Sequence, residues 1–214
     1  MRKFARFLLW TAIVLGAIVG LARAVALRWW RVPVNDPYLE AAIAPTLRGG
    51  DLLILWRLTK PEFGDLVVCP EPNMPHRVVV GRIVAQGGDH IEVEGQTLKV
   101  NERASSTEEA CIPPKFSVRH PTTSSEIEQQ CQMESLAGHL HMRGSTVQHG
   151  MMPRTVDSRV DSGKVFLLSD NRLLPYDSRD FGQVEAKTCT ETVIFRLVGV
   201  KGFFDVATRF TLIR

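Results

Sequence analysis

Two polar motifs that lie more than a hundred residues apart contain residues of types that could serve a reaction. The first motif spans residues 44–51 and contains Pro45, Thr46 and Asp51. The second spans residues 169–182 and mixes hydroxyl, carboxyl and guanidinium groups. A serine hydroxyl becomes a nucleophile only when a neighbouring base takes its proton. Without such a base, the second motif is typical of an Asx-type turn with local ion pairs.

A third stretch, residues 81–89, begins with Gly-Arg-Ile and ends with Gly-Asp. In this order, behind an apolar N-terminus, the three stretches resemble the type I signal peptidases (leader peptidases). These are membrane-anchored serine proteases that use a Ser/Lys dyad. The resemblance covers residues 7–101 and 164–200 and leaves the middle of the chain uncovered.

The resemblance puts the reactive groups of that family at positions where this chain has none. The serine position is Ala42, whose methyl group cannot form an acyl-enzyme, and the lysine position is Gly81. The family serine that orients the lysine corresponds to Pro175. The side chain that often completes the oxyanion hole corresponds to Glu40, whose carboxylate would repel a developing oxyanion. No catalytic residue is therefore predicted.

The other motif residues are predicted to have structural roles or to line a groove. Four of them, Asp170, Arg172, Asp177 and Arg179, could form an ion-pair lattice that holds the second motif against the strand carrying Gly81. The full set is Pro45, Thr46, Asp51, Arg82, Asp89, Asp170, Asn171, Arg172, Asp177, Ser178, Arg179 and Gly182.

These observations predict a catalytically inactive signal-peptidase-like protein that binds exported peptides or a partner in the secretion machinery. The groove would accept an extended peptide by strand addition, or residues 102–163 would contact and regulate an active signal peptidase. The alternative is an active serine endopeptidase that removes signal peptides with a displaced nucleophile. His76 is the candidate base for that alternative. The serines considered for it are Ser105, Ser106, Ser169 and Ser178.

The N-terminal segment is predicted to be a membrane anchor. Residues 7–22 carry no charge, and the apolar run continues past Arg23 to Leu27. At about 1.5 Å per residue this run reaches the roughly 30 Å thickness of the hydrocarbon layer, provided that Arg23 extends to the interface. Two tryptophans follow, as in an interfacial belt. The competing interpretation is a signal peptide cleaved at 24–26. The resemblance implies a single span in the cell (inner or cytoplasmic) membrane, with the N-terminus inside and the rest outside.

After the anchor, short β-rich runs alternate with turns that contain Gly and Pro, which indicates a mainly β, antiparallel barrel or sandwich. The domains predicted are an anchor at 1–31 and a β domain at 32–214. Within the β domain, residues 102–163 show only a weak strand at 138–143 and are predicted to be a variable insertion, a lid or partly disordered. The predicted strands are 51–57, 65–69, 77–85, 90–94, 97–101, 164–168 and 192–198.

The composition is that of a folded protein, with 44% hydrophobic and 23% charged residues. A net charge of +3 is too small to indicate a nucleic-acid partner. Cys111 and Cys131 lie in one polar segment and could close a disulfide in an oxidising compartment. Cys69 and Cys189 lie in apolar, strand-like surroundings and are interpreted as buried thiols.

A zinc site is the last candidate for chemistry in the sequence. His139, His141 and His149 lie near Cys111 and Cys131, but their spacing matches no zinc-ligand pattern. The interpretation as a disulfide in a solvated loop is preferred, and neither a metal nor a cofactor is predicted.

Overall fold

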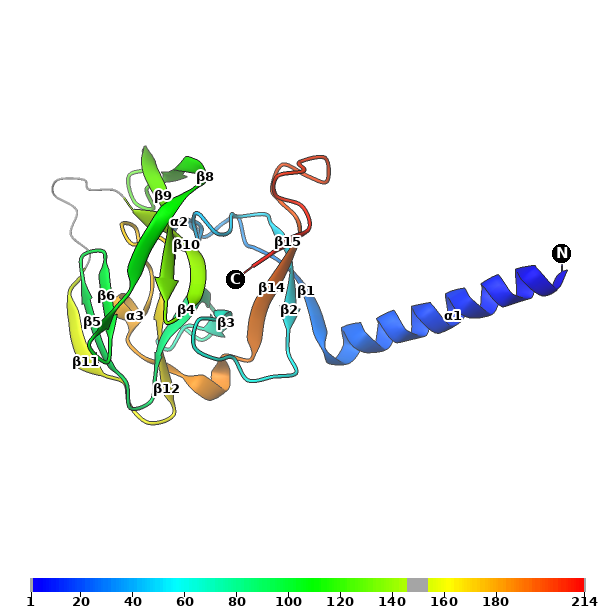
Figure 1. The fold of residues 1–214 in the computed structure, drawn as a ribbon, viewed down its shortest axis with the longest axis horizontal. Helices are drawn as coiled ribbons and strands as arrows, with labels where there is room; N and C mark the ends of the chain where they lie inside the picture. Colours follow the sequence, from blue (N-terminus) through cyan, green and yellow to red (C-terminus); the bar gives the residue numbers. More distant parts are fainter. Residues whose placement is uncertain (1, 146–153, 214) are drawn as a thin grey trace.

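A computed structural model describes residues 2–145 and 154–213 of the chain. The N-terminal helix α1 (Arg2–Val25) stands away from a mainly β domain (Figure 1). Its window Arg6–Val25 is apolar enough to cross a membrane, and none of it is buried against the domain. Twenty residues of helix extend about 30 Å, the thickness of the hydrocarbon layer.

The main sheet of the domain is antiparallel throughout, and its first strand belongs to a segment that the sequence analysis assigned to the anchor. β1 (Leu27–Arg31) starts one residue after α1 ends and pairs with β2 (Leu52–Trp56). The spatial order is β1, β2, β14 (Glu191–Val198), β3 (Leu66–Pro70), β4 (Val78–Gln86), β12 (Lys164–Leu168) and β13 (Val184–Glu185), with β15 (Thr211–Leu212) paired to β14. Short runs rich in Val, Ile and Leu between turn residues explain why the sequence predicted most of these strands.

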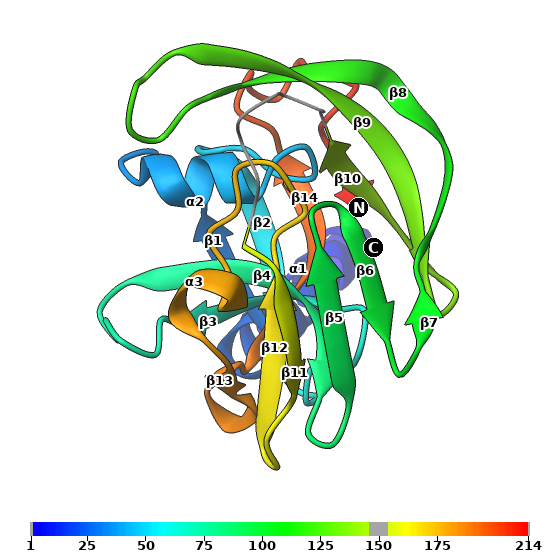
Figure 2. The same cartoon turned by 90° about the vertical axis from the view of Figure 1, so that its left-hand side faces the viewer.

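The described residues of the segment 102–163 form more strands than the sequence analysis expected. One sheet has the order β11 (Val156–Arg159), β5 (His90–Glu94), β6 (Thr97–Val100) and β7 (Arg103–Ala104). Another has the order β10 (His139–Ser145), β9 (Glu126–Leu136) and β8 (Ser106–Arg119). Figure 2 shows β8 and β9 as a long hairpin that arches over the domain. Most of the polar residues in this hairpin lie on exposed positions, and they interrupt the apolar alternation that a sequence analysis looks for.

Three short helices complete the described part of the chain: α2 (Pro37–Ala42), α3 (Ser178–Phe181) and the 3-10 helix η1 (Ala186–Thr188). Asp36 caps α2, since its carboxylate accepts hydrogen bonds from the backbone N–H groups of Tyr38 and Leu39. The carboxylate of Asp177 caps α3 in the same way. The helix α2 ends just before the motif at residues 44–51, and α3 lies at the end of the motif at residues 169–182.

An apolar cluster joins α2 to the β8–β9 hairpin. It combines Ala41 and Ala44 with Phe116, Ile127 and Leu173, together with neighbouring side chains. These apolar side chains are removed from water when the hairpin packs on the α2 segment, and this burial stabilises the hairpin in that position.

The cysteines are all paired in the structure. Cys111 bonds to Cys131 within the hairpin, as the sequence analysis considered. Cys69 bonds to Cys189, so the interpretation of these two residues as buried thiols is wrong. They are 120 residues apart, and the sequence offers no local spacing that would pair them. The pairing of β14 with β3 brings the two ends together.

The two disulfides should contribute unequally to stability, because a longer closed loop restricts the unfolded chain more. Replacing Cys69 and Cys189 by serine should lower the free energy of unfolding by about 5 kcal/mol, and replacing Cys111 and Cys131 by about 3 kcal/mol. Urea unfolding of the full chain in detergent at neutral pH measures both losses. Equal losses would contradict the long-range bridge.

Candidate functional site

The position that corresponds to the family serine lies at the end of α2. Ala42 is buried, with 1% of its surface exposed. Its carbonyl accepts a hydrogen bond from the backbone N–H of Asn171 at 3.1 Å, and the carbonyl of Ala41 accepts one from Asn171 Nδ2 at 2.9 Å. Asn171 therefore holds the last turn of the helix against the second motif. The methyl group of Ala42 has neither a lone pair nor a proton to exchange.

The position that corresponds to the family lysine lies on β4. Gly81 is buried, and a Cβ atom added to it would lie 3.0 Å from Cβ of Leu167 on the neighbouring strand β12. That separation is shorter than an ordinary van der Waals contact between carbon atoms. Leu167 itself is fully buried. A side chain at position 81 would thus require Leu167 to move.

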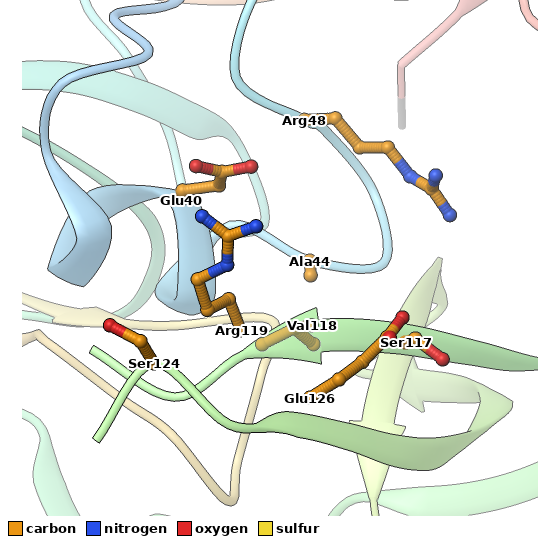
Figure 3. Close-up of a pocket in the computed structure, with 8 residues that line it drawn as sticks. All are labelled: Glu40, Ala44, Arg48, Ser117, Val118, Arg119, Ser124 and Glu126. Atoms are coloured by element: carbon orange, nitrogen blue, oxygen red, sulfur yellow. The ribbon is translucent and has the colours of Figure 1, made fainter. Parts of the chain in front are cut away.

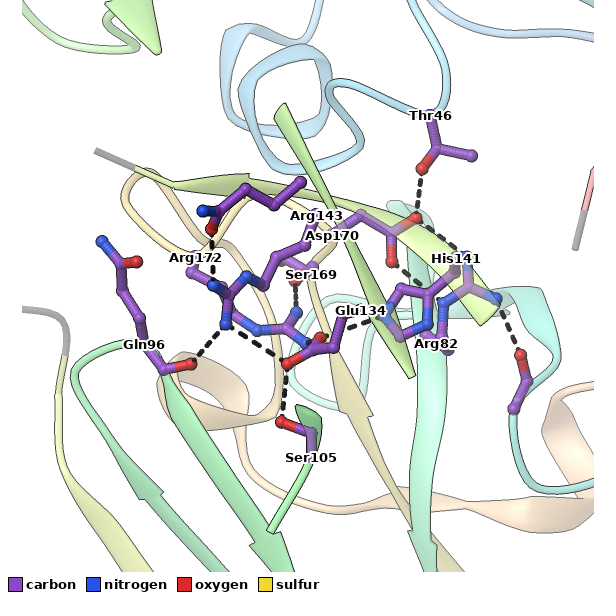
Figure 4. A network of polar contacts seen from close by, with 12 residues as sticks. Thr46, Arg82, Gln96, Ser105, Glu134, His141, Arg143, Ser169, Asp170 and Arg172 are labelled. Atoms are coloured by element: carbon purple, nitrogen blue, oxygen red, sulfur yellow. Dashed lines mark hydrogen bonds and ion pairs between the residues drawn. The ribbon is translucent and has the colours of Figure 1, made fainter. Parts of the chain in front are cut away.

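A buried carboxylate joins the first and last motifs beside Gly81 (Figure 4). Asp170 accepts two hydrogen bonds from Arg82, at 3.0 Å to Nε and 3.0 Å to Nη2, and a third from Thr46 Oγ1 at 2.5 Å. Arg82 Nη1 also donates to the carbonyl of Gly64 at 2.7 Å. Burial raises the pKa of Asp170, but the charge and hydrogen bonds of Arg82 outweigh burial, so the pKa lies below its usual value.

A second buried carboxylate, that of Glu134 on β9, is one that sequence reasoning missed. It pairs with Arg172 of the last motif and accepts hydrogen bonds from His141 Nε2 at 3.1 Å, Arg143 Nη1 at 3.3 Å and Ser105 Oγ at 2.7 Å (Figure 4). Glu134, His141 and Arg143 lie in the segment that the resemblance did not cover. The signal that could have predicted them is the presence of ionisable residues among the apolar, inward-facing positions of two adjacent strands, Glu134 on β9 and His141 and Arg143 on β10.

The ion pairs of the second motif also involve residues outside the four that the sequence analysis named. Asp177 and Arg179 do pair with each other, through hydrogen bonds of 2.9 and 2.7 Å. Asp170, however, pairs with Arg82, and Arg172 pairs with Glu134. These ion pairs tie the second motif to β4, the strand that carries Gly81, and also to the β8–β9 hairpin.

Neither buried carboxylate is arranged as a general base. Burial raises the pKa of Glu134, but the charge of Arg172 and the hydrogen bond from His141 lower it well below the usual value for a carboxyl group. A carboxylate with so low a pKa binds a proton weakly and cannot activate Ser105 at neutral pH. Burial lowers the pKa of His141, the hydrogen bond with Glu134 raises it, and the charges of Arg82 and Arg172 lower it again, so the pKa lies below its usual value.

The other serines considered as displaced nucleophiles hold backbone groups. Ser169 Oγ accepts a hydrogen bond from the backbone N–H of Tyr176 at 3.2 Å, and Ser178 Oγ accepts one from that of Leu167 at 2.9 Å. Ser106 opens β8 on an exposed position, and His76 lies exposed on the turn before β4. Within 2–145 and 154–213, the structure gives no hydrogen bond between any of these serines and a histidine or lysine side chain.

The remaining motif residues shape turns. Asp51 accepts hydrogen bonds from the backbone N–H groups of Arg48 and Val200, and Asp89 accepts one from that of Gln86. Pro45 lies in the turn after α2, and Gly182 ends α3 with a φ of 83°, a conformation that favours glycine. These roles agree with a maintained fold and require no catalysis.

Glu40 and Pro175, the two support-equivalent positions, are far less enclosed than the carboxylates. Pro175 is half-buried in the loop after Leu174. Glu40 is exposed and lines a cleft of about 380 Å³ between the α2 segment and the β8–β9 hairpin (Figure 3). The cleft is lined by Glu40, Ala44, Arg48, Ser117, Val118, Arg119, Ser124 and Glu126. Ala42 is not among the lining residues, so the cleft lies beside the serine-equivalent position and not over it.

An ion pair ties the start of β4 to the start of α2. Arg77 donates two hydrogen bonds of 2.8 Å to Asp36, and its guanidinium lies 4.2 Å from the ring centroid of Tyr176. Beyond this point β12 pairs with β4 only from Arg82 to Gln86. In the described chain, the edge of β4 from Val78 to Gly81 that faces away from β3 has no strand partner.

The histidines of the zinc hypothesis are dispersed. His139 packs edge-on against Phe63, His141 contacts Glu134, and His149 lies outside the described residues. In the part of the chain that the structure describes, no group of three His, Cys, Asp or Glu side chains could hold a metal ion.

Comparisons with known proteins match the chain to signal peptidases. Residues 5–198 match the family described as signal peptidase, peptidase S26. A signal peptidase I from Streptococcus pneumoniae serotype 4 is 24% identical over 205 residues, which cover 92% of this chain and 96% of that protein. A crystal structure of a signal peptidase I from Enterococcus faecalis V583 is 20% identical, covers 63% of this chain and 97% of that one, and has a TM-score of 0.39.

The lowered pKa of Glu134 predicts how stability depends on pH. The unfolded-state pKa is about 4.3, so on acidification the unfolded chain takes up the proton before the folded chain does. Glu134 therefore stabilises the fold above this pH, and the contribution is lost as the pH falls toward the folded-state pKa. Glu134→Gln should lower the free energy of unfolding by about 3–5 kcal/mol at pH 7 because it leaves Arg172 unpaired. Between about pH 5 and pH 3, the free energy of unfolding of this variant should fall by less than that of the unmodified chain.

Urea unfolding of the full chain in detergent at several pH values measures both effects. Glu128→Gln is the matched control, because Glu128 lies on the same strand with its side chain 63% exposed and should leave the pH dependence unchanged. A Glu134→Gln variant with the pH dependence of the unmodified chain would rule out the assigned role.

Proposed function

The chain belongs to the signal peptidase family, peptidase S26, and we propose that it is a membrane-anchored member without peptidase activity that binds an extended peptide. The observation that carries the proposal is the pair of residues at the dyad-equivalent positions. Ala42 offers only a methyl group, Gly81 offers no side chain, and both are buried.

The chemistry of serine proteases supports inactivity. Loss of either the nucleophile or its base costs about a million-fold in turnover, and here neither residue type stands at its expected position. A displaced nucleophile would need a base, and the carboxylate beside Ser105 has a pKa far too low for that role. The retained Thr46–Asp170–Arg82 cluster is explained by the fold alone.

The free edge of β4 supports peptide binding. Residues 78–81 present backbone N–H and C=O groups that β12 does not pair, and an extended peptide can add to such an edge as a further strand. In the described residues this edge lies next to α2, whose contacts with β4 keep the two elements together. The proposed ligand is an exported peptide, either alone or as part of a preprotein.

The disulfides support an extracytoplasmic β domain. All four cysteines are paired, and disulfides persist in oxidising compartments rather than in the cytoplasm. In this proposal α1 crosses the cytoplasmic membrane with its N-terminus inside, and the β domain meets its peptide on the outer side.

Restoring the dyad tests whether its loss explains inactivity. The unmodified chain should not cleave a preprotein. Ala42→Ser with Gly81→Lys should also be inactive, because the new Cβ at position 81 would lie 3.0 Å from that of Leu167. Adding Leu167→Gly, which removes that Cβ, together with Pro175→Ser should give cleavage that mass spectrometry detects, and the same variant with Ala42 retained is the control. Cleavage by the unmodified chain that disappears when one serine is mutated would refute the proposal.

Arg77→Ala tests the binding edge. The Arg77–Asp36 pair spans the start of the free edge and must yield to an incoming peptide. Because a partly exposed pair is worth up to about 1 kcal/mol, its removal should tighten binding by about two- to fivefold. Fluorescence anisotropy of a labelled peptide with an Ala-x-Ala end measures the Kd on the full chain in detergent.

Lys115→Ala is the matched control for this measurement, since it removes an exposed ion pair with Glu128 that does not involve β4 and should leave the Kd unchanged. The absence of peptide binding in the unmodified chain and in both variants would refute this part of the proposal.

A further inference from the structure

The guanidinium of Arg77 lies among acidic and aromatic groups at the start of the free edge of β4. Besides its two hydrogen bonds to Asp36, its Nη1 atom lies 3.6 Å from Oε2 of Glu71. The ring centroids of Tyr176 and Tyr38 lie 4.2 and 5.5 Å from the guanidinium carbon, and the two rings lie 5.5 Å apart. We define the acidic cage as Asp36, Tyr38, Glu71 and Tyr176. Carboxylates and aromatic rings are the groups that bind guanidinium and ammonium ions in proteins.

Glu71 has an unused hydrogen-bond acceptor that faces into the cage. The residue is buried, with 2% of its surface exposed, between β3 and β4. Burial and a hydrogen bond with Glu71 raise the pKa of Tyr176 to about 12, so the tyrosine hydroxyl remains protonated at neutral pH. Among the described residues, Oε2 of Glu71 has no hydrogen-bond partner, and its ion pair with Arg77 is longer than a hydrogen bond. Buried carboxylate oxygens normally have such a partner, so this atom can accept from a further donor.

The charges around the cage favour a further cation. Among the ion pairs of the described residues, Asp36 and Glu71 share Arg77 as their cation. The carboxylate of Asp180 also acts on the ring of Tyr176, whose pKa it raises. Two carboxylates therefore share one positive charge, with a third carboxylate nearby, and a second cation would be attracted to the same place.

The cage lies where a strand added to β4 would pass. Residues 78–81 form the edge that β12 leaves unpaired, and Arg77 directly precedes them. A peptide that pairs with this edge and continues by one residue places a residue opposite Arg77. Directly opposite residues of an antiparallel pair point to the same face, with Cβ atoms about 5 Å apart. A lysine or arginine at that position of the peptide therefore reaches the carboxylates that Arg77 contacts.

We propose that the acidic cage recognises a positively charged side chain, lysine or arginine, of the bound peptide, and that Arg77 fills the cage while no peptide is bound. This inference rests on the proposed binding of a peptide at the edge of β4 and adds the class of peptide. A basic residue can replace Arg77 beside both carboxylates, so no buried charge loses its partner in the exchange. A neutral residue that displaced Arg77 would leave Glu71 buried without a cation, which is unfavourable.

A lysine scan of an otherwise uncharged, labelled peptide with an Ala-x-Ala end tests the inference on the full chain in detergent. Each peptide carries one lysine at a successive position, and matched peptides carry norleucine or glutamate there. Fluorescence anisotropy should show that lysine tightens the Kd about tenfold over norleucine at one position only, because hydrogen bonds between charged groups are strong. Glutamate at that position should weaken binding, because it would be repelled by the carboxylates of the cage.

Variants of the cage show where the lysine binds, and the measured quantity is the ratio of the Kd values of the norleucine and lysine peptides. Glu71→Gln and Asp36→Asn should each lower this ratio toward unity, and asparagine keeps the cap of α2. Arg77→Ala should raise the ratio, because the cage then has no cation of its own. Glu94→Gln is the matched control, since Glu94 is exposed on β5 in another sheet and should leave the ratio unchanged.

The outcomes separate this inference from the proposed function. Binding of the neutral peptide without a preference for lysine at any position would overturn the inference but would leave the proposed peptide binding unaffected. Equal tightening by lysine at every position would overturn it as well, because it would indicate attraction by net charge alone. A preference that persists in both Glu71→Gln and Asp36→Asn would assign the lysine to another surface and overturn it. Absence of binding by every peptide would refute the proposed function, and this inference with it.

Discussion

The carboxylate of Asp170 connects segments that are remote in the sequence, and the architecture around the candidate site depends on it. It takes two hydrogen bonds from Arg82 on β4 and one from Thr46 after α2. All three side chains are buried. A charge in such a place is tolerated only when it is paired and its hydrogen bonds are satisfied. Removal of any one of these residues would deprive at least one of the other two buried side chains of a hydrogen bond. The three residues therefore stabilise the fold as a unit.

The requirement for paired buried charges can preserve these motif residues even where peptidase activity is not preserved. The cluster beside Gly81 stabilises the fold whether or not a base stands next to it, because the free energy of an unpaired buried charge does not depend on catalysis. Ala42 and Gly81 are small and apolar, and replacing a serine and a lysine by such residues removes groups that would themselves need hydrogen-bond partners. Under the proposed function, the reactive atoms are absent while ion pairs and hydrogen bonds hold the surrounding frame in place.

The sequence predicted the parts of the fold that follow from local rules. Strands with alternating apolar residues were found, as was the apolar helix at the N-terminus. The hairpin β8–β9 was missed because its buried residues are few and are separated by exposed polar ones. The partner of Arg172 was missed for a different reason: Glu134 lies 38 residues away, and no local pattern links an arginine in a turn to a carboxylate on a strand. The same holds for Cys69 and Cys189, which only the strand order brings together.

The junction between the helix and the domain has a mechanical consequence. Ala26 is the only residue between α1 and β1, and it is held from both sides, by its N–H to the carbonyl of Ala22 and by its carbonyl to the N–H of Arg57. A joint without slack transmits torque, so a rotation of the helix about its own axis would turn the whole sheet by the same angle. With one residue between α1 and β1, the distance of the β domain from the end of the helix cannot vary as it would on a flexible linker. A molecule that contacts the domain must therefore approach the end of the helix to within the dimensions of the domain.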